Sequence, residues 1–332
     1  MLFRSTFCQF GAGRIGLIHA ANIAAHPGAE LRYVVDVNQP AAEALAAKYG
    51  AKVTTADAAL ADPAIKAVLI ASSTDTHADL IERAAKAGKA ILCEKPVDLS
   101  LARVDACLEV AAKAGVPLLI GFNRRFDPSF GTLRQELVGG AIGKLELLTI
   151  TSRDPGPPPM AYIKVSGGLF RDMMIHDFDL ARWLLGEEPI EVYATASCLV
   201  DPAIGQAGDI DTAAVVLRTR SGTIAQISNS RRAVYGYDQR IEAFGSGGML
   251  RAENRTPTTV ERATAAAVSR DKPLHFFLER YAEAYRAELD HFVTAVGKGE
   301  KLSVGGADGR AALALAEAAL ESSKTGKPVK PA

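Results

Sequence analysis

Asp172 and His176 have a spacing that suits proton transfer. They lie four residues apart, so on a helix they share one face. A carboxylate that close can fix the tautomer of an imidazole and stabilise its protonated form, as a general base requires. A surface salt bridge is the alternative reading. A metal site with Asp177 and Asp179 is disfavoured, because no second His or Cys lies nearby.

A second charged motif is Glu94-Lys95-Pro96, which follows the apolar run Ala90–Cys93. If that run is a strand of a parallel sheet, the motif stands at its carboxyl end, where open α/β sheets bind ligands. Taken alone, the motif could equally be a solvated charged pair before a helix.

A glycine-rich segment near the N-terminus has the pattern GxGxxG. Gly11 permits a tight turn, Gly13 lets the backbone approach a pyrophosphate, and Gly16 allows close packing of helix on strand. The start of the following helix would offer free N–H groups to the phosphates. A glycine-rich turn in a nucleotide-free domain is the alternative.

Asp36 closes the second apolar run, where an acidic residue meets the ribose hydroxyls of a dinucleotide. A carboxylate there favours NAD and repels the 2′-phosphate of NADP. Arg14 and Arg32 leave some use of NADP open. We therefore expect NAD as the cofactor.

The elements that position these motifs alternate regularly over the first 120 residues. Apolar strands that alternate with helices predict a parallel sheet covered on both faces. We expect strands at Phe7–Phe10, Leu31–Val37, Ala67–Ala71, Ala90–Cys93 and Pro117–Ile120, and helices at Ile15–Ala25, Pro40–Tyr49, His77–Ala87 and Leu101–Ala114.

After Gly121 the pattern changes to successive β-rich runs separated by tight turns, which favours a mostly antiparallel sheet. Asp154–Pro159 must be a loop, because it is rich in proline. We expect strands at Leu145–Thr151, Glu191–Cys198, Thr212–Arg220, Gly222–Ser228 and Gln239–Gly245, and helices at Phe276–Val296 and Gly309–Ser322. The predicted architecture is an α/β domain over residues 1–120 and an α+β domain over 121–332.

Composition excludes several classes of protein. The 332 residues contain 38 Lys and Arg and 38 Asp and Glu, so no net charge favours a nucleic-acid backbone or an anionic membrane. No apolar window is long enough to span a membrane, and residues 1–10 do not resemble a secretory signal. The four cysteines form no CxxC pair, which is typical of reduced thiols and predicts a cytoplasmic protein.

Together these motifs resemble the Gfo/Idh/MocA oxidoreductase family, over essentially the full chain. GAGRIG (11–16) and CEKP (93–96) mark the superfamily, whereas FRDMMIHDFD (170–179) and YGYDQR (235–240) are more specific to its inositol-oxidising group. The resemblance implies an N-terminal Rossmann domain that binds NAD and a C-terminal α+β domain with an open, mostly antiparallel sheet. It also implies a homo-oligomer, a dimer or a tetramer, built on that sheet.

The resemblance further implies oxidation of one hydroxyl of myo-inositol to a ketone, giving scyllo-inosose and NADH. His176 would take the hydroxyl proton, Asp172 would orient His176, and Lys95 would stabilise the developing alkoxide. The implied substrate-binding residues are Lys95, Arg125, Asp154, Asp172, His176 and Tyr235. The implied cofactor-binding residues are Gly11, Ala12, Gly13, Arg14, Ile15, Gly16, Asp36, Val37, Ser73, Thr74, His77, Glu94 and Lys95.

Several alternatives remain open. Arg125, with Arg124, could form ion pairs between the two domains, and Asp154 could cap a turn. Tyr235 could belong to a subunit interface, and His77 could begin a helix without touching a ligand. The substrate could be scyllo-inositol, D-chiro-inositol or an aldopyranose such as glucose, since one inverted centre changes only a few hydrogen bonds worth about 1 kcal/mol each. A non-catalytic NAD sensor is disfavoured, because it would be expected to lack Lys95, Asp172 or His176.

Overall fold

The computed structural model describes residues 4–332, and the chain forms two compact units. The first contains the chain up to Phe126 together with Ala284–Leu313. The second contains Asp127–Glu283 and Ala314–Ala332. Each unit is described by itself.

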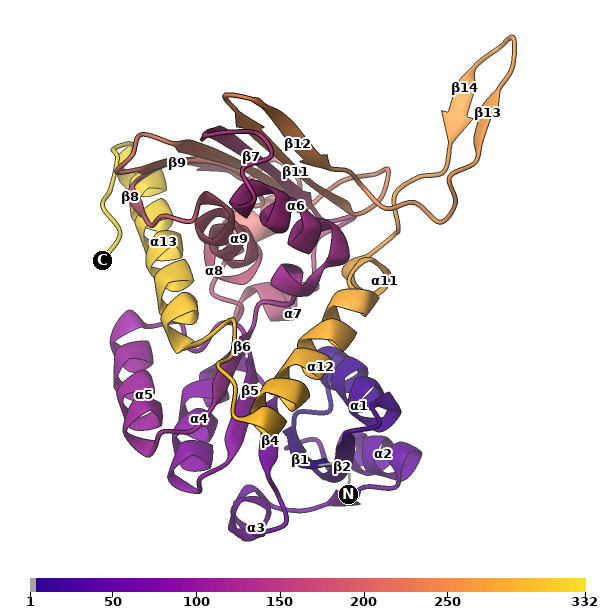
Figure 1. The fold of residues 1–332 in the computed structure, drawn as a ribbon, viewed down its shortest axis with the longest axis vertical. Coiled ribbons are helices and arrows are strands. Elements are labelled where there is room, and N and C mark those ends of the chain that lie inside the picture. The colour runs from indigo at the N-terminus through magenta and orange to yellow at the C-terminus, as the bar shows by residue number, and fades with distance from the viewer. Residues whose placement is uncertain (1–3) are drawn as a thin grey trace. The chain divides into compact units, whose positions relative to one another are not determined.

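The first unit is built on a six-stranded parallel sheet with the order β3-β2-β1-β4-β5-β6. Figure 1 shows α4 and α5 on one side of this sheet and α1, α2 and α12 on the other. The strands are β1 (Ser5–Phe10), β2 (Ala29–Val35), β3 (Lys52–Val53), β4 (Ala67–Ile70), β5 (Ala90–Glu94) and β6 (Leu118–Gly121). The helices are α1 (Arg14–Ala25), α2 (Gln39–Tyr49), α3 (Ala56–Ala61), α4 (His77–Lys86), α5 (Leu101–Ala114) and α12 (Ala282–Lys298), with 3-10 turns η1 (Thr74–Thr76) and η2 (Asn123–Phe126).

The helix α12 completes the core of this unit, although it comes late in the sequence. Its residues Leu289, Phe292 and Val293 belong to the same buried cluster as Phe7 of β1, and the Phe7 and Phe292 rings lie 5.9 Å apart. The predicted boundary at residue 120 therefore differs from the observed division. An apolar helix face must be covered, and the sequence does not say which sheet covers it.

The second unit contains a six-stranded sheet with the order β12-β11-β7-β10-β9-β8. Every neighbouring pair is antiparallel except β7 with β10, so the sheet is mixed but mostly antiparallel, as expected. The strands are β7 (Leu145–Arg153), β8 (Pro189–Ser197), β9 (Thr212–Thr219), β10 (Ile224–Ser230), β11 (Asp238–Gly245) and β12 (Gly248–Ala252).

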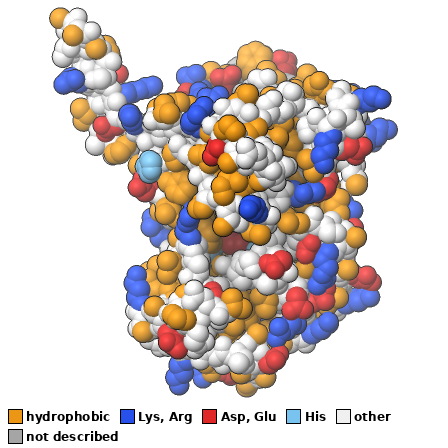
Figure 2. Space-filling model, turned by 180° about the vertical axis from the view of Figure 1, so that it is seen from behind, with side chains coloured by type: hydrophobic (Ala, Val, Ile, Leu, Met, Phe, Trp, Pro, Cys, Tyr) orange, Lys and Arg blue, Asp and Glu red, His pale blue; other side chains and the backbone are white. Residues whose placement is uncertain are grey.

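Seven helices are given below for this second unit, six of them with 11 residues or fewer. A two-stranded arm projects away from the sheet (Figures 1 and 2). The arm consists of β13 (Glu261–Ala263) and β14 (Val268–Arg270), whose residues are all exposed. The helices are α6 (Pro128–Val138), α7 (Met160–Ile163), α8 (Leu169–Asp172), α9 (Ile175–Leu185), α10 (Pro202–Gln206), α11 (Phe277–Arg280) and α13 (Gly306–Thr325).

The predicted strands and helices all exist, with shifted ends. The sequence analysis gave no bounds for β3, α3, the helices α6 to α10, β12 or the arm, and it merged α11 and α12 into one helix. Among residues 4–332, no helix is both long enough and apolar enough to cross a membrane.

Candidate active site

The GxGxxG turn has the backbone geometry that its sequence predicts. Gly11 follows β1 with φ +104°, and a Cβ atom there would lie 2.3 Å from the backbone oxygen of Ala71. A Cβ at Gly16 would lie 2.3 Å from the oxygen of Gly11. Both positions therefore require glycine. Gly11 has a positive φ and lies against the Ala71 backbone, and Gly16 packs closely on the turn.

Gln9 holds this turn together, a role that the sequence analysis did not assign. Its buried side-chain Nε2 donates to the oxygens of Gly11 and Gly16, each at 2.8 Å. A buried polar residue inside an otherwise apolar strand was the available signal, because such a side chain needs partners.

The start of α1 can accept phosphate groups. Gly13 is the N-cap of the helix and offers no side-chain cap, and the first turn contains no acidic residue. A Cβ at Gly13 would meet no atom within 4 Å, so space is open over this residue. Uncapped N–H groups beside open space fit the pyrophosphate of a dinucleotide.

Asp36 lies one residue beyond β2 and is fixed by the backbone. Its Oδ2 accepts from the N–H of Ala12 at 2.6 Å, and its Oδ1 accepts from the N–H of Asn38 at 2.7 Å. The carboxylate is thereby tied to the glycine turn. The neighbouring Val37 side chain is fully exposed. These two residues fit the adenosine half of NAD.

The turn after β4 contributes Ser73 and Thr74, which begin η1, and then His77, which begins α4. The His77 ring is buried, its Nδ1 lies 2.8 Å from the Pro96 oxygen, and its Nε2 lies 3.1 Å from the Ser72 oxygen. Burial lowers the pKa of His77, against the opposing effect of these carbonyls. The ring thus links the β4 turn to the turn after β5.

Lys95 follows β5 directly, and its peptide bond to Pro96 is cis. Because carboxyl ends of parallel strands meet at one edge of a sheet, Lys95 lies at the same edge as Gly11, Asp36 and Ser73. Arg125, also in this unit, donates to Asp308 Oδ1 at 2.8 Å. The two residues belong to one unit, so this ion pair is not between units.

In the second unit, two consecutive glycines set the direction of α8. Gly167 and Gly168 have φ of +86° and +85°, and a Cβ at Gly168 would lie 2.8 Å from Asp209 Oδ1. That same oxygen accepts from the N–H of Leu169 at 3.0 Å. Asp209 therefore holds the start of α8 by this hydrogen bond. Position 168 must be glycine, because a side chain there would collide with the Asp209 carboxylate.

Asp172 ends α8 and is held by two side chains. Its Oδ1 accepts from the Tyr162 hydroxyl at 2.8 Å, and its Oδ2 lies 3.4 Å from Arg231 NH2. Arg231 is 1% exposed and also lies 3.8 Å from Asp209. Its charge is therefore balanced inside the unit by the two carboxylates. The sequence analysis assigned no role to Tyr162, Asp209 or Arg231.

His176 is the second residue of α9, so it does not share one regular helix with Asp172. The Met174 N–H bonds to the Leu169 oxygen, five residues back, which interrupts the helix between them. The start of α9 is fixed to the sheet, because Asn229 Nδ2 on β10 donates to buried Asp177 at 2.9 Å.

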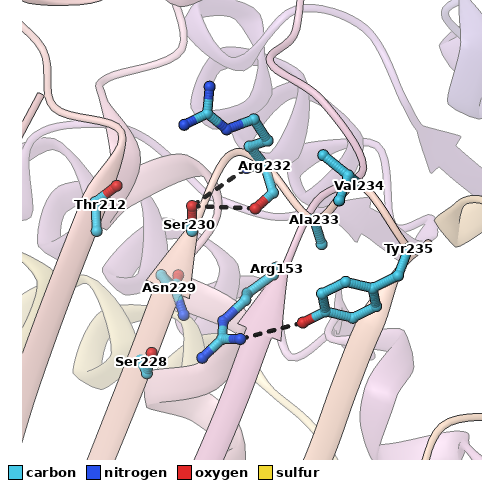
Figure 3. Close-up of a pocket in the computed structure, with 9 residues that line it drawn as sticks. All are labelled: Arg153, Thr212, Ser228, Asn229, Ser230, Arg232, Ala233, Val234 and Tyr235. Atoms are coloured by element: carbon cyan, nitrogen blue, oxygen red, sulfur yellow. Dashed lines mark hydrogen bonds between the residues drawn. The ribbon is translucent and has the colours of Figure 1, made fainter. Parts of the chain in front are cut away.

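Tyr235 and Asp154 lie at the ends of the second sheet's strands. The Tyr235 hydroxyl donates to Asp238 at 2.6 Å. It accepts from Arg153 at 3.1 Å (Figure 3). Burial, and then the bond to Asp238, raises the pKa of Tyr235. Asp154 follows β7, and its N–H donates to the Ser230 oxygen. Its role in substrate binding, like that of Tyr235, stays a prediction.

Tyr235 also lines an open pocket of about 400 Å³. The described residues that line it include neither Asp172 nor His176. They are Arg153, Thr212, Ser228, Asn229, Ser230, Arg232, Ala233, Val234 and Tyr235 (Figure 3).

Only one cluster of three potential metal ligands occurs among the described residues, and it does not include Asp172 or His176. Cys8, Cys93 and Cys107 are buried and Cys198 is partly exposed, and all four are free thiols. Burial raises the pKa of Cys8 and of Cys107 to about 12, so both are unreactive.

A six-stranded parallel sheet with this glycine turn and a carboxylate just after β2 is typical of a dinucleotide-binding domain. Comparison with known families agrees. Residues 7–122 match the oxidoreductase family with an NAD-binding Rossmann fold, and residues 130–251 match the GFO/IDH/MocA C-terminal domain. The chain belongs to the Gfo/Idh/MocA family and is an NAD-dependent dehydrogenase.

Three relatives cover nearly the whole chain. Inositol 2-dehydrogenase of Rhizobium meliloti (strain 1021) is 56% identical, covering 95% of this chain and 96% of its own. Myo-inositol 2-dehydrogenase of Thermotoga maritima is 49% identical, covering 96% of each. The structure of scyllo-inositol dehydrogenase from Lactobacillus casei with bound NAD(H) and scyllo-inositol matches with a TM-score of 0.92 and 29% identity, covering 98% of this chain and 99% of that one.

Proposed function

We propose that this dehydrogenase oxidises one ring hydroxyl of myo-inositol to a ketone and produces scyllo-inosose and NADH. The observation that carries the proposal is the 56% identity to an inositol 2-dehydrogenase over 95% of the chain. The Asp172 carboxylate, held by Tyr162 and Arg231 and followed four residues later by His176, supports it.

The reaction assigns one role to each of three side chains. His176 takes the hydroxyl proton, Asp172 orients the imidazole and stabilises its cationic form, and the Lys95 ammonium stabilises the alkoxide character that develops on the oxygen. NAD⁺ held by the first unit would supply the acceptor for the hydride that leaves the same carbon. The alcohol thus loses a proton and a hydride, which leaves the ketone.

The Tyr162–Asp172–Arg231 contacts explain why Asp172 can keep one direction. A phenol and a guanidinium approach different oxygens of its carboxylate, at 2.8 and 3.4 Å. Such charge-assisted contacts fix a carboxylate in both position and rotation. In the proposed mechanism, this fixed carboxylate is the group that orients the His176 imidazole.

The remaining hydroxyls of the polyol require several polar partners and little apolar wall. Arg125, Asp154 and Tyr235 are our candidates, by their match to the family pattern. Arg125 already donates to Asp308 through NH2. We therefore expect only the rest of its guanidinium to donate to a substrate hydroxyl.

Two competing substrates, scyllo-inositol and D-chiro-inositol, differ from myo-inositol at one ring centre, and glucose shares part of its hydroxyl pattern, so a panel of substrates tests the proposal. NADH absorbance is followed with myo-inositol, scyllo-inositol, D-chiro-inositol and glucose, each with NAD and with NADP. We expect the highest kcat/KM for myo-inositol with NAD. A higher kcat/KM for any other member of the panel would replace the proposed substrate, and no turnover with any polyol would end the proposal.

The proposal also includes a homo-oligomer in the cytoplasm. The four free thiols fit a reducing compartment. One face of the second sheet carries apolar side chains that are 40–48% exposed, which is unusual for a face that stays in water. These side chains are Tyr193, Val216, Ile224, Phe244 and Met249.

A further inference from the structure

A cluster of three buried titratable side chains lies inside the first unit, and the mechanism above does not use it. His19 of α1, Glu94 of β5 and Glu288 of α12 offer one nitrogen and two carboxylate oxygens, all within 4.8 Å of one another. His19 and Glu288 are 0% exposed and Glu94 is 7% exposed. Groups of this kind are rarely buried unless they are paired.

The geometry indicates that a proton holds His19 and Glu94 together. His19 Nε2 lies 2.7 Å from Glu94 Oε1, which is the length of a charge-assisted hydrogen bond. Two ligands of a zinc ion, each about 2.0–2.1 Å from the metal in a tetrahedron, would lie more than 3 Å apart. A proton therefore fits this contact better than a metal ion does.

Glu288 is the third member, and neither of its carboxyl oxygens has a hydrogen-bond partner among the described residues. Burial, and then the charge of Glu94, raises the pKa of Glu288 well above its usual value. The Glu288 carboxyl is thus packed beside the Glu94 carboxylate without a hydrogen bond to it, and the raised pKa favours its protonated form. The charged or titratable groups around the cluster are Tyr285 beside His19 and, near Glu94, Cys93, Lys95 and His77.

The cluster is attached to the residue before Lys95. Glu94 ends β5, and its carboxyl lies against Gly121 of β6, where a Cβ atom would stand 3.0 Å from Glu94 Oε2. On the other side of Lys95, the Pro96 carbonyl is held by His77 at 2.8 Å. Lys95 is thus flanked by two residues that buried histidines hold.

We propose that His19 and Glu288 are positioning residues for Lys95, which act by holding the Glu94 carboxylate at the end of β5. This inference rests on the proposed function, since it takes Lys95 to act on the substrate oxygen. Misplacing a reacting group by about 1 Å can cost about 100-fold in rate, so a small rotation of β5 at Glu94 is enough to matter.

Three variants of the full-length protein test this. Glu288→Met keeps the side-chain length but removes the carboxyl, Glu288→Gln keeps a polar group without charge, and His19→Gln removes the imidazole that bonds to Glu94. We expect Glu288→Met and His19→Gln to lower kcat about 10- to 100-fold, with the Kd of NADH changed less than 3-fold. Glu288→Gln should recover most of the kcat lost in Glu288→Met.

Phe292→Leu is the matched control, because it lies one turn from Glu288 on α12 and packs on Phe7. It should lower thermal stability without changing kcat. Glu288→Met should raise thermal stability, since removing an unpartnered buried carboxyl favours folding, but it should lower kcat. Unchanged kcat in both Glu288→Met and His19→Gln would overturn the proposal, as would a stoichiometric metal found by elemental analysis of the wild type and lost in Glu288→Gln.

A second measurement does not depend on the substrate. Because the pKa of Glu288 is raised in the folded state, the folded protein keeps a proton that the unfolded chain releases above pH ~4.3. The stability that this proton contributes is therefore lost as pH rises. The stability of Glu288→Gln relative to wild type should therefore increase from pH 5 to pH 9. If wild type oxidises no polyol, the proposed function fails while this measurement still tests the cluster; a pH-independent difference would show that Glu288 does not hold the proton.

Discussion

At the scale of single residues, replacing His176 should lower the catalytic rate without weakening the binding of the cofactor. Its imidazole belongs to the second unit, whereas the glycine turn and Asp36 belong to the first. We expect His176→Ala to lose at least about 100-fold in kcat, the lower range for a general base, while its Kd for NADH stays near the wild-type value. Stopped-flow turnover and NADH fluorescence measure the two quantities.

His275→Ala is the control for this variant, since His275 lies in an exposed segment and its backbone N–H, not its ring, bonds to Glu279. It should leave both quantities unchanged. Wild-type turnover in His176→Ala at every pH tested would remove His176 from the role of base.

Asp36 determines which nicotinamide cofactor is preferred, if its carboxylate meets the ribose. We expect Asp36→Ser to lower the ratio of kcat/KM for NAD over NADP by about 10- to 100-fold, because one charged hydrogen bond contributes about 1.5–3 kcal/mol. Asp36→Asn is the matched control: it retains an oxygen for the Ala12 N–H and removes only the charge. The same ratio in all three proteins would place the ribose elsewhere.

At the scale of elements, Gly168 couples the backbone of α8 to Asp209. Gly168→Ala introduces both strain at φ +85° and a contact 2.8 Å from the Asp209 carboxylate. We expect a loss of more than about 1–2 kcal/mol in the free energy of unfolding, the penalty for the left-handed backbone alone, and a lower kcat because α8 carries Asp172.

Gly222→Ala separates these effects, because Gly222 has φ +91° but nothing within 4 Å of a Cβ atom. It should lose stability through strain and keep wild-type kcat. Denaturant unfolding and steady-state kinetics measure both, and equal kcat in the two variants would contradict a role for the Gly168 turn in placing Asp172.

His77 links two turns of the first unit, and its lowered pKa gives stability a pH dependence. The folded protein holds the ring neutral, whereas the unfolded chain binds a proton below pH ~6.5, so this contribution is present above that pH and is lost as pH falls. The difference in unfolding free energy between wild type and His77→Asn should shrink by up to about 1.4 kcal/mol from pH 6.5 to pH 5.5. An equal difference at both pH values would show that the pKa of His77 is the same in the folded and the unfolded protein.

Elements could be predicted where the pattern that specifies them lies in adjacent residues of the chain. The strands and helices around Gly11, Asp36 and Lys95 have continuous apolar runs and glycine or proline at their ends, so their sequence specifies them. The partners of Asp172 could not be found in this way, because Tyr162 and Arg231 lie 10 and 59 residues away and meet it only after folding. The grouping of Glu288 with His19 and Glu94 could not be predicted for the same reason, because these residues lie far apart in the chain.

At the scale of the whole molecule, the outward face of the second sheet predicts self-association. Tyr193 pairs with Val216 and Phe244 with Met249 across neighbouring strands, so these exposed apolar side chains are adjacent pairs on one surface. Burying such pairs contributes about 25 cal/mol per Å², which favours a second copy of the chain over water. Light scattering should therefore give a mass of at least twice the 35.0 kDa of one chain.

Phe244→Glu should shift this mass towards one chain, because it places a charge beside Met249 among the exposed apolar side chains. Val138→Glu is the matched control: Val138 is also exposed, at 67%, but it ends α6 outside the sheet. Its mass should equal that of the wild type. A wild-type mass of one chain at micromolar concentration, or equal masses for the two variants, would mean that this face of the sheet does not join copies of the protein.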